Sequence, residues 1–131
     1  MIHGLNTQKI QDLSRDLNSP DIAVRFLSDF LAMLPERLER IQAAVAACDD
    51  ETAMDAVLSL TITAAMTGAV DTGACCHALQ SSIRNVDFTL AHSQVATLAD
   101  IVTTLQDAAP ALLAQASNTL ALDEDVGCTA A

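Results

Sequence analysis

The sequence has few aromatic residues: three phenylalanines and no tryptophan or tyrosine among 131 residues. Hydrophobic residues nevertheless make up 51% of the chain, so alanine, leucine and valine must fill the core. These side chains suit closely packed helices better than a β-sandwich, which depends on aromatic and β-branched cross-strand pairs. A chain of this length is expected to form one domain with a single modest core.

Basic residues are also scarce. Six lysines and arginines stand against 17 acidic residues, which gives a formal net charge of −11. Five of the six lie in residues 9–40 and none follows Arg84, so the chain beyond Arg84 is acidic wherever it is charged. We therefore expect no nucleic acid and no membrane as partner, because both require a basic patch. A protein partner with a basic patch and a merely solubilising charged face both remain compatible with this balance.

Several other features are absent. Residues 1–12 lack the apolar core of a secretory signal, and no apolar run reaches the roughly 18 residues of a bilayer span. The four cysteines show no C-x-x-C spacing and the three histidines are scattered, so we expect reduced thiols, no metal, no cofactor and a cytoplasmic protein. No Ser/His/Asp set, glycine-rich phosphate loop or paired-carboxylate signature is present, and we expect no enzyme.

The spacing of apolar residues predicts helices. They span about residues 6–17, 20–47, 49–68, 71–84 and 87 onward. Ser19 and Pro20 form a start signal for the second helix, and Pro35 and Pro110 should bend the second helix and bend or split the last one. Short connections between four long helices predict an all-α, up-down-up-down four-helix bundle with a short N-terminal helix.

The domain boundary is expected near residue 120. Residues 1–120 should form the single helical bundle. Residues 121–131 contain Asp123-Glu124-Asp125 and no periodic pattern, so an acidic disordered tail is predicted there.

Residues 57–69 read Val-Leu-Ser-Leu-Thr-Ile-Thr-Ala-Ala-Met-Thr-Gly-Ala. This run resembles the acceptor helix of the histidine phosphotransfer (HPt) family, whose usual form is Ala-His-Ser/Thr-Leu-Lys-Gly-Ser-Ala-Ala-x-Leu-Gly-Ala. The preceding Phe-Leu-x-x-Phe-Leu-x-x-Leu-Pro-x-Arg-Leu run of residues 26–38 and the Cys-Cys-x-x-Leu-Gln run of residues 75–80 extend the likeness over about residues 20–116. The resemblance implies an HPt-like fold and a place in a two-component phosphorelay.

The packing residues of that motif are kept and the chemical residues are not. In this frame the acceptor histidine is replaced by Leu58, the lysine three residues on by Thr61, and the glycine four residues on by Ile62. Leucine has no lone pair to accept a phosphoryl group, and threonine has no positive charge to offset it. Ile62 fills the space that the family's glycine leaves for the receiver's phosphoaspartate. The resemblance therefore implies an HPt-like protein that lacks phosphotransfer through this site.

Helical geometry separates two faces of this segment, one containing Leu60 and one on the far side. The second face comprises Met54, Leu58, Ile62 and Ala65, with Thr61 at its edge. If this apolar stripe is exposed, it has the character of a binding surface. If the helix is rotated or covered by a neighbour, the same residues are ordinary core. The segment is apolar almost all round, so periodicity leaves both possibilities open.

These observations predict a pseudo-HPt protein. It would bind a receiver or histidine-kinase domain without carrying phosphate, and so inhibit, titrate or scaffold a two-component pathway. Two alternatives remain. The first is a helical interaction module that forms a homodimer or binds another helix through the stripe. The second is a phosphocarrier that uses His77, which falls on an outward position of the following helix; His92 is a weaker candidate.

Overall fold

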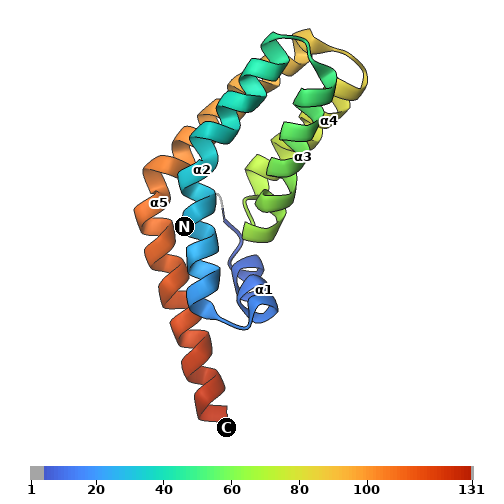
Figure 1. Ribbon diagram of the computed structural model, residues 1–131. Helices are drawn as coiled ribbons and strands as arrows, with labels where there is room; N and C mark the ends of the chain where they lie inside the picture. Colours follow the sequence, from blue (N-terminus) through green and yellow to red (C-terminus); the bar gives the residue numbers. More distant parts are fainter. Residues whose placement is uncertain (1–4, 131) are drawn as a thin grey trace.

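The computed structural model describes the backbone of residues 5–130 and the side chains of residues 5–121. Within this part of the chain the regular structure consists of five α-helices (Figure 1). They are α1 (Thr7–Leu17), α2 (Pro20–Ala46), α3 (Asp50–Thr67), α4 (Val70–Arg84) and α5 (Phe88–Ala130). The predicted all-α bundle is confirmed. None of the described helices has both the length and the apolar character that a bilayer crossing requires.

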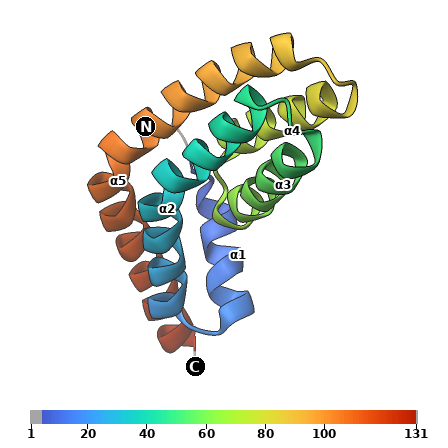
Figure 2. The same cartoon turned by 45° about the horizontal axis from the view of Figure 1, so that its top comes forward.

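The four longer helices form the bundle and α1 completes it. The long helices α2 and α5 lie side by side, and the α3–α4 hairpin covers one part of their length. The short helix α1 lies beyond the end of that hairpin, where it packs against α2, α3 and α5 (Figures 1 and 2). The N-terminal helix therefore fills the space beside α2 that α3 and α4 are too short to reach.

Aliphatic side chains fill the core, as the composition predicts. Each bundle helix contributes a fully buried leucine: Leu27, Leu34, Leu60, Leu79 and Leu98. Phe30 is the one phenylalanine that is buried. Because alanines occupy many of the remaining core positions, the helix backbones can approach one another closely, and the bundle needs few large rings.

The two internal prolines lie in neighbouring helices. Pro35 lies within α2 and Pro110 within α5, and neither residue can donate the usual backbone hydrogen bond to the carbonyl four residues earlier. Figures 1 and 2 show that both helices change direction partway along their length, α5 in the orange part of its ribbon. The expected bends are present, and α5 is bent rather than split.

The last helix extends further than the sequence predicts. The backbone of residues 121–130 is helical, whereas we expected residues 121–131 to be a disordered tail. The acidic run does not itself block a helix, since neither Asp nor Glu clashes with the preceding turn as proline does. Side chains beyond Ala121 and the whole of residue 131 lie outside the described residues, and the division at residue 120 stays a prediction.

Polar side chains begin the helices where the sequence indicates. Ser19 Oγ accepts a hydrogen bond from the Ile22 amide at 3.2 Å, and Asp87 Oδ1 accepts one from the Leu90 amide at 3.1 Å. The turn between α3 and α4 depends on Gly68, whose φ is 74°. The Gly68 carbonyl accepts a 2.8 Å hydrogen bond from the Asn6 amide, so this turn is also the point where α1 is attached.

Candidate functional site

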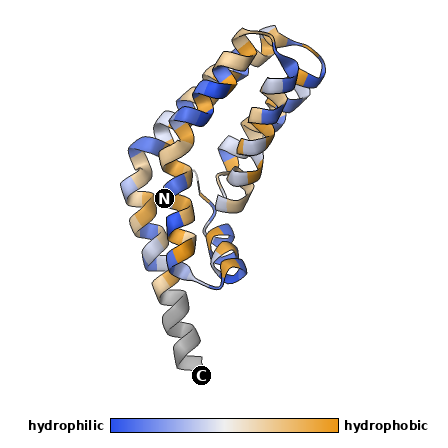
Figure 3. Cartoon of the chain, in the orientation of Figure 1, coloured by the Kyte–Doolittle hydropathy of each residue, from blue (hydrophilic) through white to orange (hydrophobic). Residues whose placement is uncertain are grey.

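One face of α3 is apolar and exposed. Leu60 is fully buried, while Leu58 is 42% exposed, Ile62 60% and Met66 38%. These three exposed residues follow one another at four-residue intervals and, with the exposed Ala65, form what we call the α3 stripe. Figure 3 colours much of α3 as hydrophobic, which is why the sequence could not separate its core face from its outer face.

The structure places the predicted stripe residues in two groups. Leu58, Ile62 and Ala65 are exposed, whereas Met54 and Thr61 are half-buried at the edge that faces α4. Met66 was missed by the sequence analysis. Its four-residue spacing from Ile62 was the signal that could have included it.

Thr61, which occupies the position of the family's lysine, links α3 to α4. Its hydroxyl donates a 2.8 Å hydrogen bond to the Val57 carbonyl and accepts one of 2.9 Å from Gln80 Nε2. Behind it, burial raises the pKa of the Cys76 thiol to about 12, the nearby Cys75 adds to this rise, and a hydrogen bond with Thr61 opposes it. The α4-facing edge of the stripe is thus held by neutral hydrogen bonds and not by a cation.

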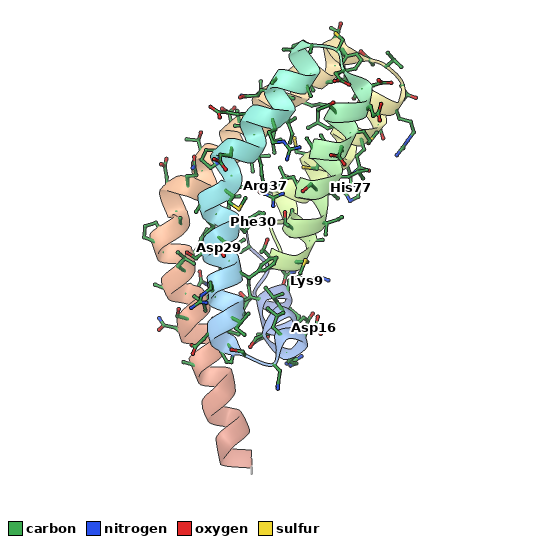
Figure 4. The ribbon with its side chains drawn as sticks, viewed as in Figure 1. Lys9, Asp16, Asp29, Phe30, Arg37 and His77 are labelled. Carbon is green, nitrogen blue, oxygen red and sulfur yellow. The ribbon has the colours of Figure 1, made fainter. Side chains whose placement is uncertain are left out.

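The opposite edge of the stripe faces α2. Arg37 Nη1 donates a 2.8 Å hydrogen bond to Ser59 Oγ, and Figure 4 shows Arg37 between α2 and α3. Its Nε is buried and has no hydrogen-bond partner among the described residues. This contact is not apparent from the sequence, because the two residues lie on different helices and no local pattern joins them.

Two hollows border the stripe along α4. The first, of about 610 Å³, lies where α3 begins and α4 ends, and acidic residues dominate its lining. Its charged lining residues are Asp50, Glu51, Asp55 and Arg84. The second, of about 340 Å³, lies at the junction of α1, α3 and α4 and is lined by Lys9, Thr61 and His77 together with small residues. We call it the junction hollow.

The two candidate histidines lie on different elements. His77 is exposed on α4, where it lines the junction hollow, and His92 is exposed on α5. Along the sequence His77 has no cation within one helical turn, but Lys9 of α1 lines the same hollow (Figure 4). Sequence reasoning could not have found this juxtaposition, because it depends on how α1 packs against the end of the hairpin.

Comparisons with known proteins agree with this architecture. The sequence model of the Hpt domain family matches residues 25–125. The HPT domain of an Hpt sensor hybrid histidine kinase from Shewanella is 23% identical, with a TM-score of 0.72 over 88% of this chain and 97% of that one. Histidine-containing phosphotransfer protein B (HptB) from Pseudomonas aeruginosa PAO1 is 19% identical, with a TM-score of 0.74 over 90% of this chain and 97% of that one. No curated protein matches the chain.

The family match and the structural matches carry different weight. At these identities the two solved structures show the fold alone, a helical bundle of the same arrangement. The family model covers most of the sequence, including the whole of α3 and α4. The order of motifs that pointed to histidine phosphotransfer proteins is therefore confirmed, and the chain belongs to the Hpt domain family.

Proposed function

We propose that this chain is a pseudo-HPt protein, which binds a receiver or histidine-kinase domain through the α3 stripe and carries no phosphate there. Hpt domains take part in two-component phosphorelays with such partners. The observation that carries the proposal is the exposure of Leu58 and Ile62 on α3, because in the motif of residues 57–69 these positions correspond to the family's phosphoacceptor histidine and neighbouring glycine.

The chemistry of the exposed residues supports binding without transfer. Leu58 reaches solvent but offers no nucleophilic atom. The Thr61 hydroxyl carries no charge and is already hydrogen-bonded to Val57 and Gln80. Ile62 projects from the neighbouring turn, so a receiver that approached Leu58 would meet a branched aliphatic side chain instead of the open space above a glycine.

The same residues provide a reason for binding. Removing exposed apolar surface from water is favourable by about 25 cal/mol per Å². Leu58 and Ile62 each retain roughly half of their accessible surface, so covering both would contribute on the order of 2 kcal/mol before the costs of association. Each receiver or kinase domain that this protein binds is no longer free to take part in the pathway. Such binding fits an inhibitor, a titrator or a scaffold.

The direct test is a binding titration. Receiver and histidine-kinase domains of the source cell are purified and titrated against the protein by calorimetry. Leu58→Glu should weaken the binding of a recognised domain at least tenfold. Leu90→Glu is the matched control, because Leu90 is 46% exposed on α5 and undergoes the same chemical change away from α3. Equal affinity of both variants and the unaltered protein would reject the stripe as the binding surface.

A second test concerns phosphate. When the protein is mixed with a phosphorylated receiver domain and Mg²⁺, we expect no acid-labile phosphate on it. Stoichiometric labelling that disappears in His77→Ala would contradict the proposal and favour the alternative in which His77, with Lys9 beside the same hollow, is the acceptor.

Homodimerisation is the second candidate function. The observation that favours it is the length of the stripe, since Met66 continues the exposed row beyond Leu58 and Ile62. Sedimentation velocity would separate the two functions. A dimer that dissociates in Leu58→Glu, together with no binding of any receiver or kinase domain, would favour self-association.

A further inference from the structure

The junction hollow has walls made mainly of small residues. Six of its lining residues are alanine or glycine: Ala64, Ala65, Gly68, Ala69, Gly73 and Ala74. Its volume of about 340 Å³ is far larger than the roughly 30 Å³ that one water occupies in the liquid. Ala65 belongs to both the hollow and the α3 stripe, so a protein that covers the stripe also reaches the mouth of the hollow.

The two glycines of the hollow show where its free space lies. At Gly68 an added Cβ would come within 2.8 Å of the Asn6 backbone, so that side is closed by the start of α1. At Gly73 an added Cβ would have no atom within 4 Å. The open part of the hollow therefore lies over the first turns of α4, next to the exposed side chain of His77.

Two of the polar side chains that line the hollow can donate hydrogen bonds to an anion. Lys9 offers an ammonium group from α1, and His77 offers an imidazole N–H from α4 (Figure 4). Among the described residues, no acidic side chain lines this hollow. The larger hollow at the other end of α4, which we call the acidic groove, is lined by Asp50, Glu51 and Asp55. In a chain with a net charge of −11, a local excess of donors next to an apolar surface selects a carboxylate over a basic group.

We propose that the junction hollow is a second anchoring point for the protein that covers the α3 stripe: it takes up a large apolar side chain of that partner, while Lys9 and His77 bind an adjacent carboxylate. The proposal rests on the proposed function, because the same receiver or kinase domain has to supply both contacts. It also fixes the direction of docking, with the partner's acidic group at the α1 end of the stripe and away from the acidic groove.

Filling the hollow provides the sharpest test. Gly73→Leu places a large side chain in the open space, and Gly73→Ala is its matched control, since both changes replace a helical glycine with a better helix former and neither should weaken the fold. The probe is the receiver or kinase domain that binds the unaltered protein, titrated by calorimetry. Gly73→Leu should weaken its binding at least tenfold, and Gly73→Ala less than threefold.

The charge of the hollow is tested separately. Lys9→Glu should weaken binding of the same domain at least tenfold and reduce the dependence of affinity on salt. Arg25→Glu is the control, because it changes the net charge by the same amount at an exposed position of α2 that does not line the hollow. If both variants lose affinity equally, general electrostatic attraction explains the effect and the carboxylate contact is wrong.

Nuclear magnetic resonance gives a readout that does not depend on mutation. The chain has four glycines, and two of them, Gly68 and Gly73, line the hollow. Their amide signals should shift when the partner binds. If Leu58→Glu abolishes binding but filling the hollow does not, and the two signals stay in place, the anchoring point is wrong and the proposed function stands. If no receiver or kinase domain binds at all, both are overturned.

Discussion

Within one turn of α3, neighbouring leucines have opposite environments. Leu60 is fully buried in the core and Leu58 is exposed, so the same residue type should have different energetic weight at the two positions. We expect Leu60→Ala to lower the free energy of unfolding by about 2–5 kcal/mol. Leu58→Ser and Ile62→Ser should change it by no more than about 0.5 kcal/mol. Urea unfolding of the three variants side by side makes the comparison, and equal destabilisation would show that the stripe is not exposed in solution.

Restoring phosphotransfer at this site should need more than placing a histidine at position 58. Leu58→His alone should transfer phosphate from a receiver poorly, because Ile62 still occupies the approach and Thr61 brings no positive charge. The triple variant Leu58→His, Thr61→Lys, Ile62→Gly should transfer faster, although glycine within a helix costs about 1 kcal/mol relative to alanine. Single-turnover transfer from a labelled receiver is the measurement. If the single variant matched the triple one, the steric reasoning would be wrong.

The buried thiol of Cys76 makes stability depend on alkaline pH. The pKa of a free cysteine is about 8.5, and burial raises the pKa of Cys76 to about 12. When the pH is below the pKa of the thiol in the unfolded chain, the thiol is neutral in both the folded and the unfolded state. Between the two values only the unfolded chain ionises, so the free energy of unfolding should fall as pH rises. The sequence has no tyrosine, so phenol groups contribute nothing to this fall.

The test of this linkage is urea unfolding at pH 7.5 and pH 10. Relative to the unaltered protein, Cys76→Ala should show a smaller loss of stability between the two conditions. Cys48→Ala, which removes an exposed thiol, is the control and should keep the original loss. An identical pH dependence in Cys76→Ala would mean that this thiol does not carry the effect.

At the residue scale, the sequence predicted what local geometry determines. It placed Leu58 and Ile62 on a face different from that of Leu60, because helical spacing alone fixes that relation. It could not decide which face was covered, since this depends on how α3 rotates against α2 and α4. The contact between Arg37 and Ser59 and the shared position of Lys9 and His77 were beyond it for the same reason: each joins residues on different helices.

Among the elements, the α3–α4 turn bears the strictest requirement. Gly68 has a φ of 74°, and an added Cβ would lie 2.8 Å from the Asn6 backbone. Gly68→Ala should therefore lower the free energy of unfolding by about 1–3 kcal/mol and loosen the attachment of α1. Gly73→Ala should instead raise it by about 0.5–1 kcal/mol, because that site is open and helical. Urea unfolding and hydrogen exchange of the α1 amides would check both effects, and opposite signs are required.

Helix boundaries were predictable where a residue forces them. Ser19 and Pro20 begin α2 and Asp87 precedes α5, because capping and the fixed φ of proline act within a few residues. The bends of α2 and α5 follow from Pro35 and Pro110 in the same local way. The end of α5 was not predictable on these grounds. No proline lies in residues 121–130 to force an end, and the predicted end near residue 120 rested on composition alone. The backbone of residues 121–130 is helical.

On the scale of the whole molecule, charge opposes the fold. The net charge is −11, and among the described residues the one ion pair is between Arg15 and Asp12, both exposed and three residues apart on α1. Such a pair contributes little. Screening should therefore stabilise the protein: raising NaCl from 0.01 to 0.5 M should raise Tm by about 3–5 °C. Thermal unfolding followed by circular dichroism tests this, and potassium fluoride at equal ionic strength should act alike. A constant or falling Tm would contradict it.

The position of α1 also affects the order in which the helices become structured while the chain is synthesised. This helix precedes every element that it contacts, namely α2, α3 and α5, and its attachment to the Gly68 carbonyl requires the α3–α4 turn. At a synthesis rate of about 5–20 residues per second, that turn follows α1 by several seconds on a ribosome, and α5 follows later still. An isolated helix of this length is marginal in water. Of the five helices, the one that is synthesised first is thus among the last to become ordered, and its docking completes the bundle.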